Sequence, residues 1–128
     1  MGKILIVDDN EAFLDILCGY IHEYYPLLNV ESCTNPIKAL GALRGDISLL
    51  LIDLEMPNLD GMKLFNYARE CGIDKNRIVI LSGRDADYLH EQFPMGTCLA
   101  VLNKYEAKQK VVLEMIFSSL NKKAAAEP

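Results

Sequence analysis

Five polar side chains stand at the ends of apolar runs in the sequence. They are three carboxylates, one hydroxyl and one ammonium: Asp8, Asp9, Asp53, Ser82 and Lys104. Carboxylates gathered at one place repel one another, and packing does not need them there. A hard cation such as Mg²⁺ removes that conflict, because it prefers oxygen ligands. With the cation bound, a phosphoryl group can approach Asp53, while Lys104 and Ser82 hold its oxygens.

The elements that must position these groups begin with five apolar runs at similar intervals. The runs are Ile4–Val7, Leu27–Cys33, Leu49–Ile52, Ile78–Leu81 and Leu99–Leu102. Four of them are continuous, which is typical of parallel strands buried on both faces. The second run alternates apolar and polar residues, so we expect it to be a half-exposed edge strand.

Segments of helical periodicity lie between and after the runs. Their apolar stripes fall within Phe13–Tyr24, Pro36–Leu43, Leu64–Cys71, Asp85–Phe93 and Val112–Leu120. This repeated strand–helix alternation predicts an α/β fold, a single flavodoxin-like (βα)5 domain. Its five-stranded parallel sheet is expected in the order 2-1-3-4-5, with helices on both faces. Ligands of such a sheet bind beyond the carboxyl ends of the strands, which is where the five polar groups fall.

Composition limits the class of protein. The chain has 128 residues, 51% of them apolar and 24% charged, with a formal charge of −5. These values predict one globular domain over residues 1–121, followed by a polar tail over 122–128. An acidic balance argues against direct nucleic-acid or membrane binding. No apolar run approaches the ~20 residues of a membrane span. Four scattered cysteines without metal-ligand spacing predict reduced thiols in a cytoplasmic protein.

Four motifs together carry a family resemblance. Asp8-Asp9 follows a strand, Asp53 opens a D-x-x-M-P-x-x-D-G run ending at Gly61, Ser82-Gly83 follows another strand, and Lys104 follows the last. With these motifs the sequence resembles the receiver domain of two-component response regulators over Lys3–Leu120. The D-x-x-M-P-x-x-D-G run is the most specific of the four.

The resemblance implies a role for each site residue. Asp53 is expected to be the phosphoacceptor. The Mg²⁺ site, which could take Mn²⁺ instead, would use Asp9 directly and Asp8 through water. Asp53 and the backbone carbonyl of Glu55 complete the set, with the Glu55 side chain at the mouth of the site.

Two further roles and two departures concern the switch. The resemblance implies that the Ser82 hydroxyl moves to the phosphoryl group and that Lys104 supplies a counter-charge. Val101 stands where the family usually has Tyr or Phe, and Tyr105 stands where it usually has a cis proline. We therefore expect a trans bond before Tyr105. We also expect an output switch that differs from the usual serine-to-aromatic coupling.

The function implied is a signalling module rather than a turnover enzyme. A sensor histidine kinase or phosphotransfer protein would phosphorylate Asp53 in an Mg²⁺-dependent reaction. Output would pass through protein contacts on the fourth helix, fifth strand and fifth helix, with a homodimer as one form. Two alternatives stay open: an Mg²⁺-dependent small-molecule phosphohydrolase acting through phospho-Asp53, with Glu55 as general acid, and a phosphorylation-independent pseudo-receiver.

Overall fold

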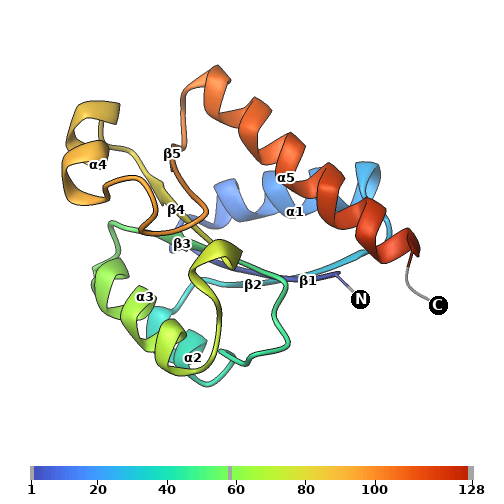
Figure 1. Ribbon diagram of the computed structural model, residues 1–128, viewed down its shortest axis with the longest axis horizontal. Coiled ribbons are helices and arrows are strands. Elements are labelled where there is room, and N and C mark those ends of the chain that lie inside the picture. The colour runs from blue at the N-terminus through green and yellow to red at the C-terminus, as the bar shows by residue number, and fades with distance from the viewer. Residues whose placement is uncertain (1, 58, 127–128) are drawn as a thin grey trace.

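The computed structural model describes residues 2–57 and 59–126. Within these residues, five parallel strands form one sheet in the order β2-β1-β3-β4-β5 (Figure 1). The strands are β1 (Gly2–Val7), β2 (Leu28–Cys33), β3 (Leu49–Asp53), β4 (Ile78–Ser82) and β5 (Ala100–Asn103). The predicted flavodoxin-like fold and strand order are confirmed. The half-exposed edge position of β2 is confirmed as well.

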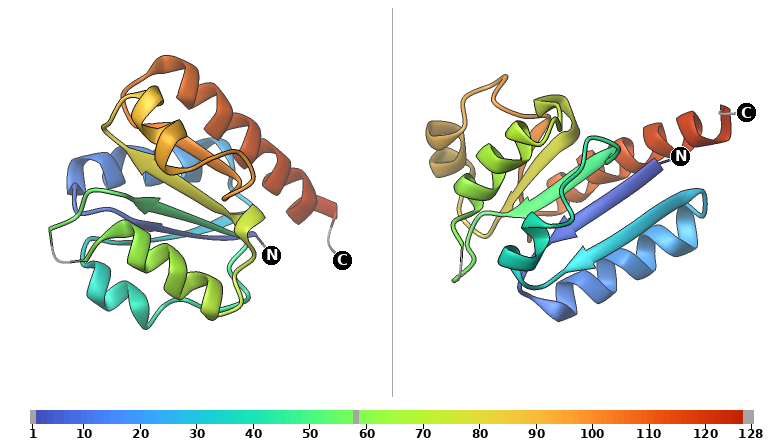
Figure 2. Two further views of the ribbon diagram at one scale, coloured as in Figure 1. Left: turned by 60° about the vertical axis from the view of Figure 1, so that its left-hand side comes forward. Right: turned by 90° about the horizontal axis from the view of Figure 1, so that it is seen from below.

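Helices cover both faces of the sheet. They are α1 (Glu11–Tyr24), α2 (Pro36–Leu40), α3 (Gly61–Glu70), α4 (Ala86–Gln92) and α5 (Ala107–Ala126), with a 3-10 turn, η1, at Lys75–Arg77. Figure 1 and Figure 2 show α1 and α5 on one face and α2 and α3 on the other. Two apolar layers result, because successive residues of a buried strand point to opposite faces. In β1, Ile4 and Ile6 join the α1/α5 layer, whereas Leu5 and Val7 join the α2/α3 layer.

Short polar side chains begin the helices that follow the functional ends of the strands. Asn10 accepts a hydrogen bond from the Phe13 N–H at 3.1 Å and caps α1. Asp60 accepts one from the Met62 N–H at 2.9 Å and caps α3. Such caps satisfy backbone donors that a helix start leaves free. They therefore fix where each helix starts after its strand.

The bounds of α2 and α5 differ from the sequence prediction. α2 ends at Leu40, three residues early, and Gly41 provides its cap. α5 begins at Ala107, before its apolar stripe, and continues through Ala126, so residues 122–126 of the expected tail are helical. Periodicity marks the apolar stripe of a helix and not its ends, which explains both differences. In the described part of the chain, no helix is both long and apolar enough to span a membrane.

Candidate functional site

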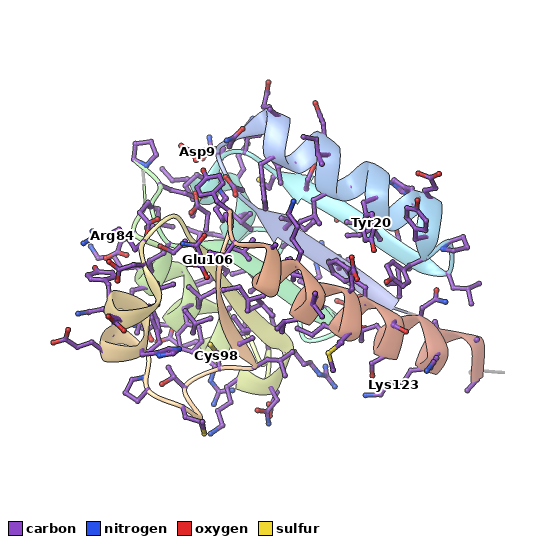
Figure 3. The ribbon with its side chains drawn as sticks, turned by 90° about the horizontal axis from the view of Figure 1, so that it is seen from above. Asp9, Tyr20, Arg84, Cys98, Glu106 and Lys123 are labelled. Carbon is purple, nitrogen blue, oxygen red and sulfur yellow. The ribbon has the colours of Figure 1, made fainter. Side chains whose placement is uncertain are left out.

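The predicted site residues meet at the carboxyl end of the sheet. Asp8 follows β1, Asp53 ends β3, Ser82 ends β4, and Lys104 follows β5. Figure 3 shows Asp9, Arg84 and Glu106 toward this end of the molecule, and Tyr20 and Lys123 toward the other. The strands are parallel, so their carboxyl ends and the residues that follow them lie at the same end of the sheet.

Three carboxylates form the centre of the site. One oxygen from each of Asp8, Asp9 and Asp53 lies within 4.8 Å of the other two. Asp8 is fully buried, Asp53 is 3% exposed, and Asp9 faces solvent. The Asn10 N–H donates to Oδ1 of Asp8 at 2.9 Å, and the Glu55 N–H donates to Oδ1 of Asp53 at 3.3 Å. Hard oxygen donors in this number suit Mg²⁺ or Mn²⁺ better than a softer metal.

Gly61 lets α3 approach the residue that ends β3. A Cβ built on Gly61 would lie 2.6 Å from the Asp53 carbonyl oxygen and 2.7 Å from the Leu54 Cα. Both neighbours are backbone atoms, so they cannot move aside as a flexible side chain could. Glycine at the start of α3 is therefore part of what places Asp53.

Lys104 lies between two of the carboxylates but is bonded to one. Its Nζ is 2.6 Å from Oδ2 of Asp8 and 3.9 Å from Oδ2 of Asp53. The ammonium also lies 4.5 Å from the centroid of the Phe13 ring on α1, where it makes a cation–π contact. The sequence had assigned Phe13 only to the apolar stripe of its helix. No local signal could have shown that its ring reaches Lys104.

The electrostatics of the site favour an added cation. Burial, and after it the charge of Asp8, raise the pKa of Asp53 to about 7 against the opposing effect of Lys104. Burial would lower the pKa of Lys104, but the hydrogen bond to Asp8 and the charge of Asp53 outweigh it, and the pKa is raised. Lys104 thus remains an ammonium, yet it does not compensate all three carboxylates.

The Ser82 hydroxyl is hydrogen-bonded to two neighbouring residues. It donates to the carboxylate of Glu55, whose oxygens lie 2.7 and 2.8 Å away, and it accepts from the Arg84 N–H at 3.0 Å. The Gly83 N–H donates to Oε1 of Glu55 at 3.0 Å. Sequence analysis named Gly83 only as part of the Ser82-Gly83 motif and missed its N–H as a donor, because a backbone donor leaves no mark in residue type.

Asn103 joins the two loops that flank the site. Its Nδ2 donates to the Arg84 carbonyl at 2.8 Å, and its Oδ1 accepts from the N–H groups of Tyr105 (2.8 Å) and Glu106 (3.2 Å). This residue was also missed, although asparagine after an apolar run is a recognised turn signal. The β4–α4 loop and the start of α5 are therefore connected directly.

The two positions that depart from the family pattern differ in burial. Val101 is half-buried and packs against the apolar layer under α2 and α3. Tyr105 is 70% exposed, and its ring edge would lie 3.3 Å from a Cβ on Gly83. The described residues contain no cis peptide bond, so the predicted trans bond before Tyr105 is confirmed.

The arrangement combines the parts that phosphoryl transfer needs. A buried carboxylate can act as a nucleophile, two neighbouring carboxylates can hold a divalent cation, and an ammonium and a hydroxyl can bind oxyanions. A carboxylate nucleophile that displaces the leaving group of a phosphoryl donor gives an acyl phosphate.

Comparison with known proteins gives one family. The family model for the response regulator receiver domain matches residues 4–116. The transcriptional regulatory protein CpxR homolog of Haemophilus influenzae is 28% identical over 87 residues, which are 68% of this chain and 37% of that protein. The chain spans only 10–37% of the length of the first curated relatives it matches.

Solved structures share the fold. A CheY-like response regulator receiver domain protein from Methanospirillum hungatei has a TM-score of 0.74 at 21% identity, covering 99% of both chains. The response regulator TrrA from Thermotoga maritima, solved in complex with Mg²⁺ and BeF, has a TM-score of 0.72 at 19% identity, covering 94% of this chain and 99% of that one.

Proposed function

Since the chain belongs to the response regulator receiver domain family, we propose that it is a phosphorylation-controlled signalling module with Asp53 as the phosphoacceptor. The observation that carries this proposal is the burial of Asp53 beside Asp8 and Lys104 at the end of the central strand. A carboxylate in this position is costly to the fold, and its use as a nucleophile explains why it is there.

The transfer itself is a simple displacement. An oxygen of Asp53 attacks phosphorus in a phosphohistidine of a sensor histidine kinase or phosphotransfer protein. The new O–P bond forms as the P–N bond breaks, and the leaving imidazole nitrogen takes up a proton. A small acyl phosphate can donate in the same way, with a carboxylate leaving. Hydrolysis of this acyl phosphate later releases inorganic phosphate and restores the Asp53 carboxylate. In this proposal the domain assists its own phosphorylation and dephosphorylation and is not a turnover enzyme.

The donor set supports a resident divalent cation. Asp9 would bind it directly, Asp8 through water, and Asp53 and the Glu55 carbonyl would complete the protein ligands. The three clustered carboxylates fit this assignment in type and in separation. When bound, Mg²⁺ or Mn²⁺ supplies the positive charge that lets an anionic phosphoryl donor approach Asp53.

Lys104 and Ser82 complete the site in this proposal. Lys104 Nζ is already 3.9 Å from Asp53 Oδ2, so a small movement of its ammonium reaches a phosphoryl oxygen. Ser82 lies on the neighbouring strand β4, directly after Leu81, which pairs with Asp53. Its hydroxyl can donate to another phosphoryl oxygen once it leaves Glu55.

Apolar surface supports protein partners for input and output. A groove of about 620 Å³ between α1 and α5 opens beside Lys104, and its rim carries the exposed Ile16 and Tyr105. We assign it to the phosphodonor protein. The α4–β5–α5 face presents other exposed large apolar residues: Met95, Leu99, Val111 and Met115. We assign this face to the downstream partner or to a second copy of the chain.

The remaining assignments follow the same proposal. The receiver unit spans residues 1–121, with 122–128 as an extension of it, and the cytoplasm is its compartment. The described cysteines are free thiols, which supports a reducing compartment. No direct role on nucleic acid or membranes is assigned, because the chain is acidic.

Intact-mass spectrometry with acetyl phosphate tests the proposal. We expect a single phosphoryl adduct that requires Mg²⁺ and is absent from Asp53→Asn. Normal labelling of Asp53→Asn would overturn the choice of residue. Repeated turnover of a chromogenic phosphate ester would favour the phosphohydrolase. No adduct with Mg²⁺ binding verified by calorimetry would favour the pseudo-receiver.

A further inference from the structure

The Glu55 carboxylate accepts hydrogen bonds from two donors at the carboxyl end of β4, the Ser82 hydroxyl and the Gly83 N–H. Ser82 Oγ is 2.7 and 2.8 Å from its oxygens, and the Gly83 nitrogen is 3.0 Å from Oε1. Glu55 itself lies two residues after Asp53, at the end of the neighbouring strand. A carboxylate held by a hydroxyl and a backbone N–H is bound as an oxyanion is bound in an enzyme.

We propose that Glu55 is a positioning residue. In the unphosphorylated protein its carboxylate accepts the Ser82 and Gly83 hydrogen bonds that a phosphoryl oxygen on Asp53 would accept, so a phosphoryl group on Asp53 must displace it. The inference rests on the proposed function, because it takes Asp53 as the phosphoacceptor. It adds that the Glu55 carboxylate competes with the phosphoryl group for these donors, and that the exchange of one anion for the other drives the switch.

Donor counting makes the two states exclusive. A serine hydroxyl has one proton and a backbone amide has one, so each donates fully to one acceptor. A phosphoryl oxygen that takes the Ser82 proton therefore leaves Glu55 without it. Two anions at the same donors also repel each other. Glu55 is an exposed residue, so its displaced carboxylate can turn into water rather than stay unpaired.

The exchange has a route to the surface that does not use Val101. Ser82 Oγ also accepts from the Arg84 N–H, and the Arg84 carbonyl accepts from Asn103. Asn103 in turn accepts from the Tyr105 N–H in the turn that precedes α5. A shift of the Ser82 hydroxyl toward Asp53 therefore displaces the β4–α4 loop, against which the Tyr105 ring lies.

The first measurement uses the unphosphorylated, Mg²⁺-free protein. Hydrogen exchange of the Gly83 amide, followed by NMR, reports whether its N–H is held. We compare the wild type with Glu55→Ala, which lacks the carboxylate, and Glu55→Asp, which keeps the charge on a side chain one methylene shorter. Glu106→Ala is the control, because it removes a negative charge at the same end of the sheet. Exchange at Gly83 should be about tenfold faster in both Glu55 variants and unchanged in the control.

The second measurement is the initial rate of Asp53 labelling by acetyl phosphate with Mg²⁺. Both Glu55 variants should label about three to ten times faster than the wild type, and Glu106→Ala should match the wild type. The proposal is overturned if Gly83 exchange is unchanged in Glu55→Ala. It is also overturned if Glu55→Asp labels like the wild type while Glu55→Ala is faster, since charge alone would then explain the effect.

Failure of the proposed function gives a different pattern. In that case no variant acquires a phosphoryl adduct, whatever happens at the Gly83 amide, and the competition is overturned together with the function. If instead the wild type is labelled normally and all variants label at the same rate, only the role of Glu55 is overturned.

Discussion

Lys104 makes a short ion pair with Asp8 and a much longer one with Asp53. The ammonium is 2.6 Å from Oδ2 of Asp8 and 3.9 Å from Oδ2 of Asp53. Asp8 is fully buried, so this ion pair provides its positive partner in the absence of a metal. Lys104 therefore has two tasks. It stabilises the metal-free fold through Asp8, and in the proposed reaction it turns to the phosphoryl group on Asp53.

Replacement of Lys104 should affect both tasks. Lys104→Met should lower the rate of Asp53 labelling by acetyl phosphate about 100-fold, because a charged group near the transferred phosphoryl is lost. It should also lower the free energy of unfolding by about 3 kcal/mol without Mg²⁺, because Asp8 stays buried and unpaired. Urea denaturation with and without Mg²⁺ measures the second effect.

Lys110→Met is the matched control, since Lys110 is an exposed lysine of α5. It should label and unfold like the wild type. Equal stability of Lys104→Met and the wild type in EDTA would show that the Lys104–Asp8 pair contributes nothing to the metal-free fold.

The stability of the metal-free protein should fall as pH rises from about 4 to about 7. Folding raises the pKa of Asp53 from its ordinary value near 4 to about 7. Between these values the folded protein binds a proton that the unfolded chain does not, so the free energy of unfolding decreases with pH. One such group gives a slope of at most about 1.4 kcal/mol per pH unit.

Asp53→Asn isolates this contribution. The variant should have a flatter pH profile than the wild type in EDTA and should be more stable than it at pH 7. Urea titrations at several pH values measure both profiles. Parallel profiles for the two proteins would contradict the raised pKa of Asp53.

Removal of Asp9 should weaken Mg²⁺ binding without unfolding the protein. Asp9→Asn should raise the dissociation constant measured by titration calorimetry at least about tenfold, because a directly bound carboxylate is lost. Asp9 is exposed, so the free energy of unfolding should change by no more than about 0.5 kcal/mol. Asp15→Asn, an exposed aspartate of α1, should bind Mg²⁺ like the wild type. An unchanged affinity in Asp9→Asn would remove Asp9 from the proposed ligands.

Two glycines in helices should respond in opposite directions to alanine. Gly61→Ala should lower the free energy of unfolding by about 2–3 kcal/mol, because its Cβ would meet the backbone of Asp53 and Leu54 at 2.6 and 2.7 Å. Gly19→Ala in α1 should raise it by about 0.5–1 kcal/mol, since nothing lies within 4 Å of that Cβ. Thermal denaturation of both variants measures the difference. Tolerance of alanine at Gly61 would contradict the close approach of α3 to β3.

The sequence alone determined the sheet and the place of the site. Apolar runs identify buried strands, and the alternation of strands with helices leaves few topologies, so β1, β3 and β4 and their order were predictable. Residues that follow parallel strands must share one edge, whatever their side chains do. This is why the sequence was enough to predict that Asp8, Asp53 and Ser82 lie close together.

Only the tertiary structure decided how these residues pair. Whether Lys104 bonds to Asp8 or Asp53 depends on differences of about an ångström, which no residue type encodes. The contact of Glu55 with Ser82 and Gly83 depends in the same way on a side-chain rotamer and on the path of a loop. Strand periodicity fixes the edge on which a residue lies, whereas hydrogen-bond partners are chosen by the packing of the whole chain around that edge.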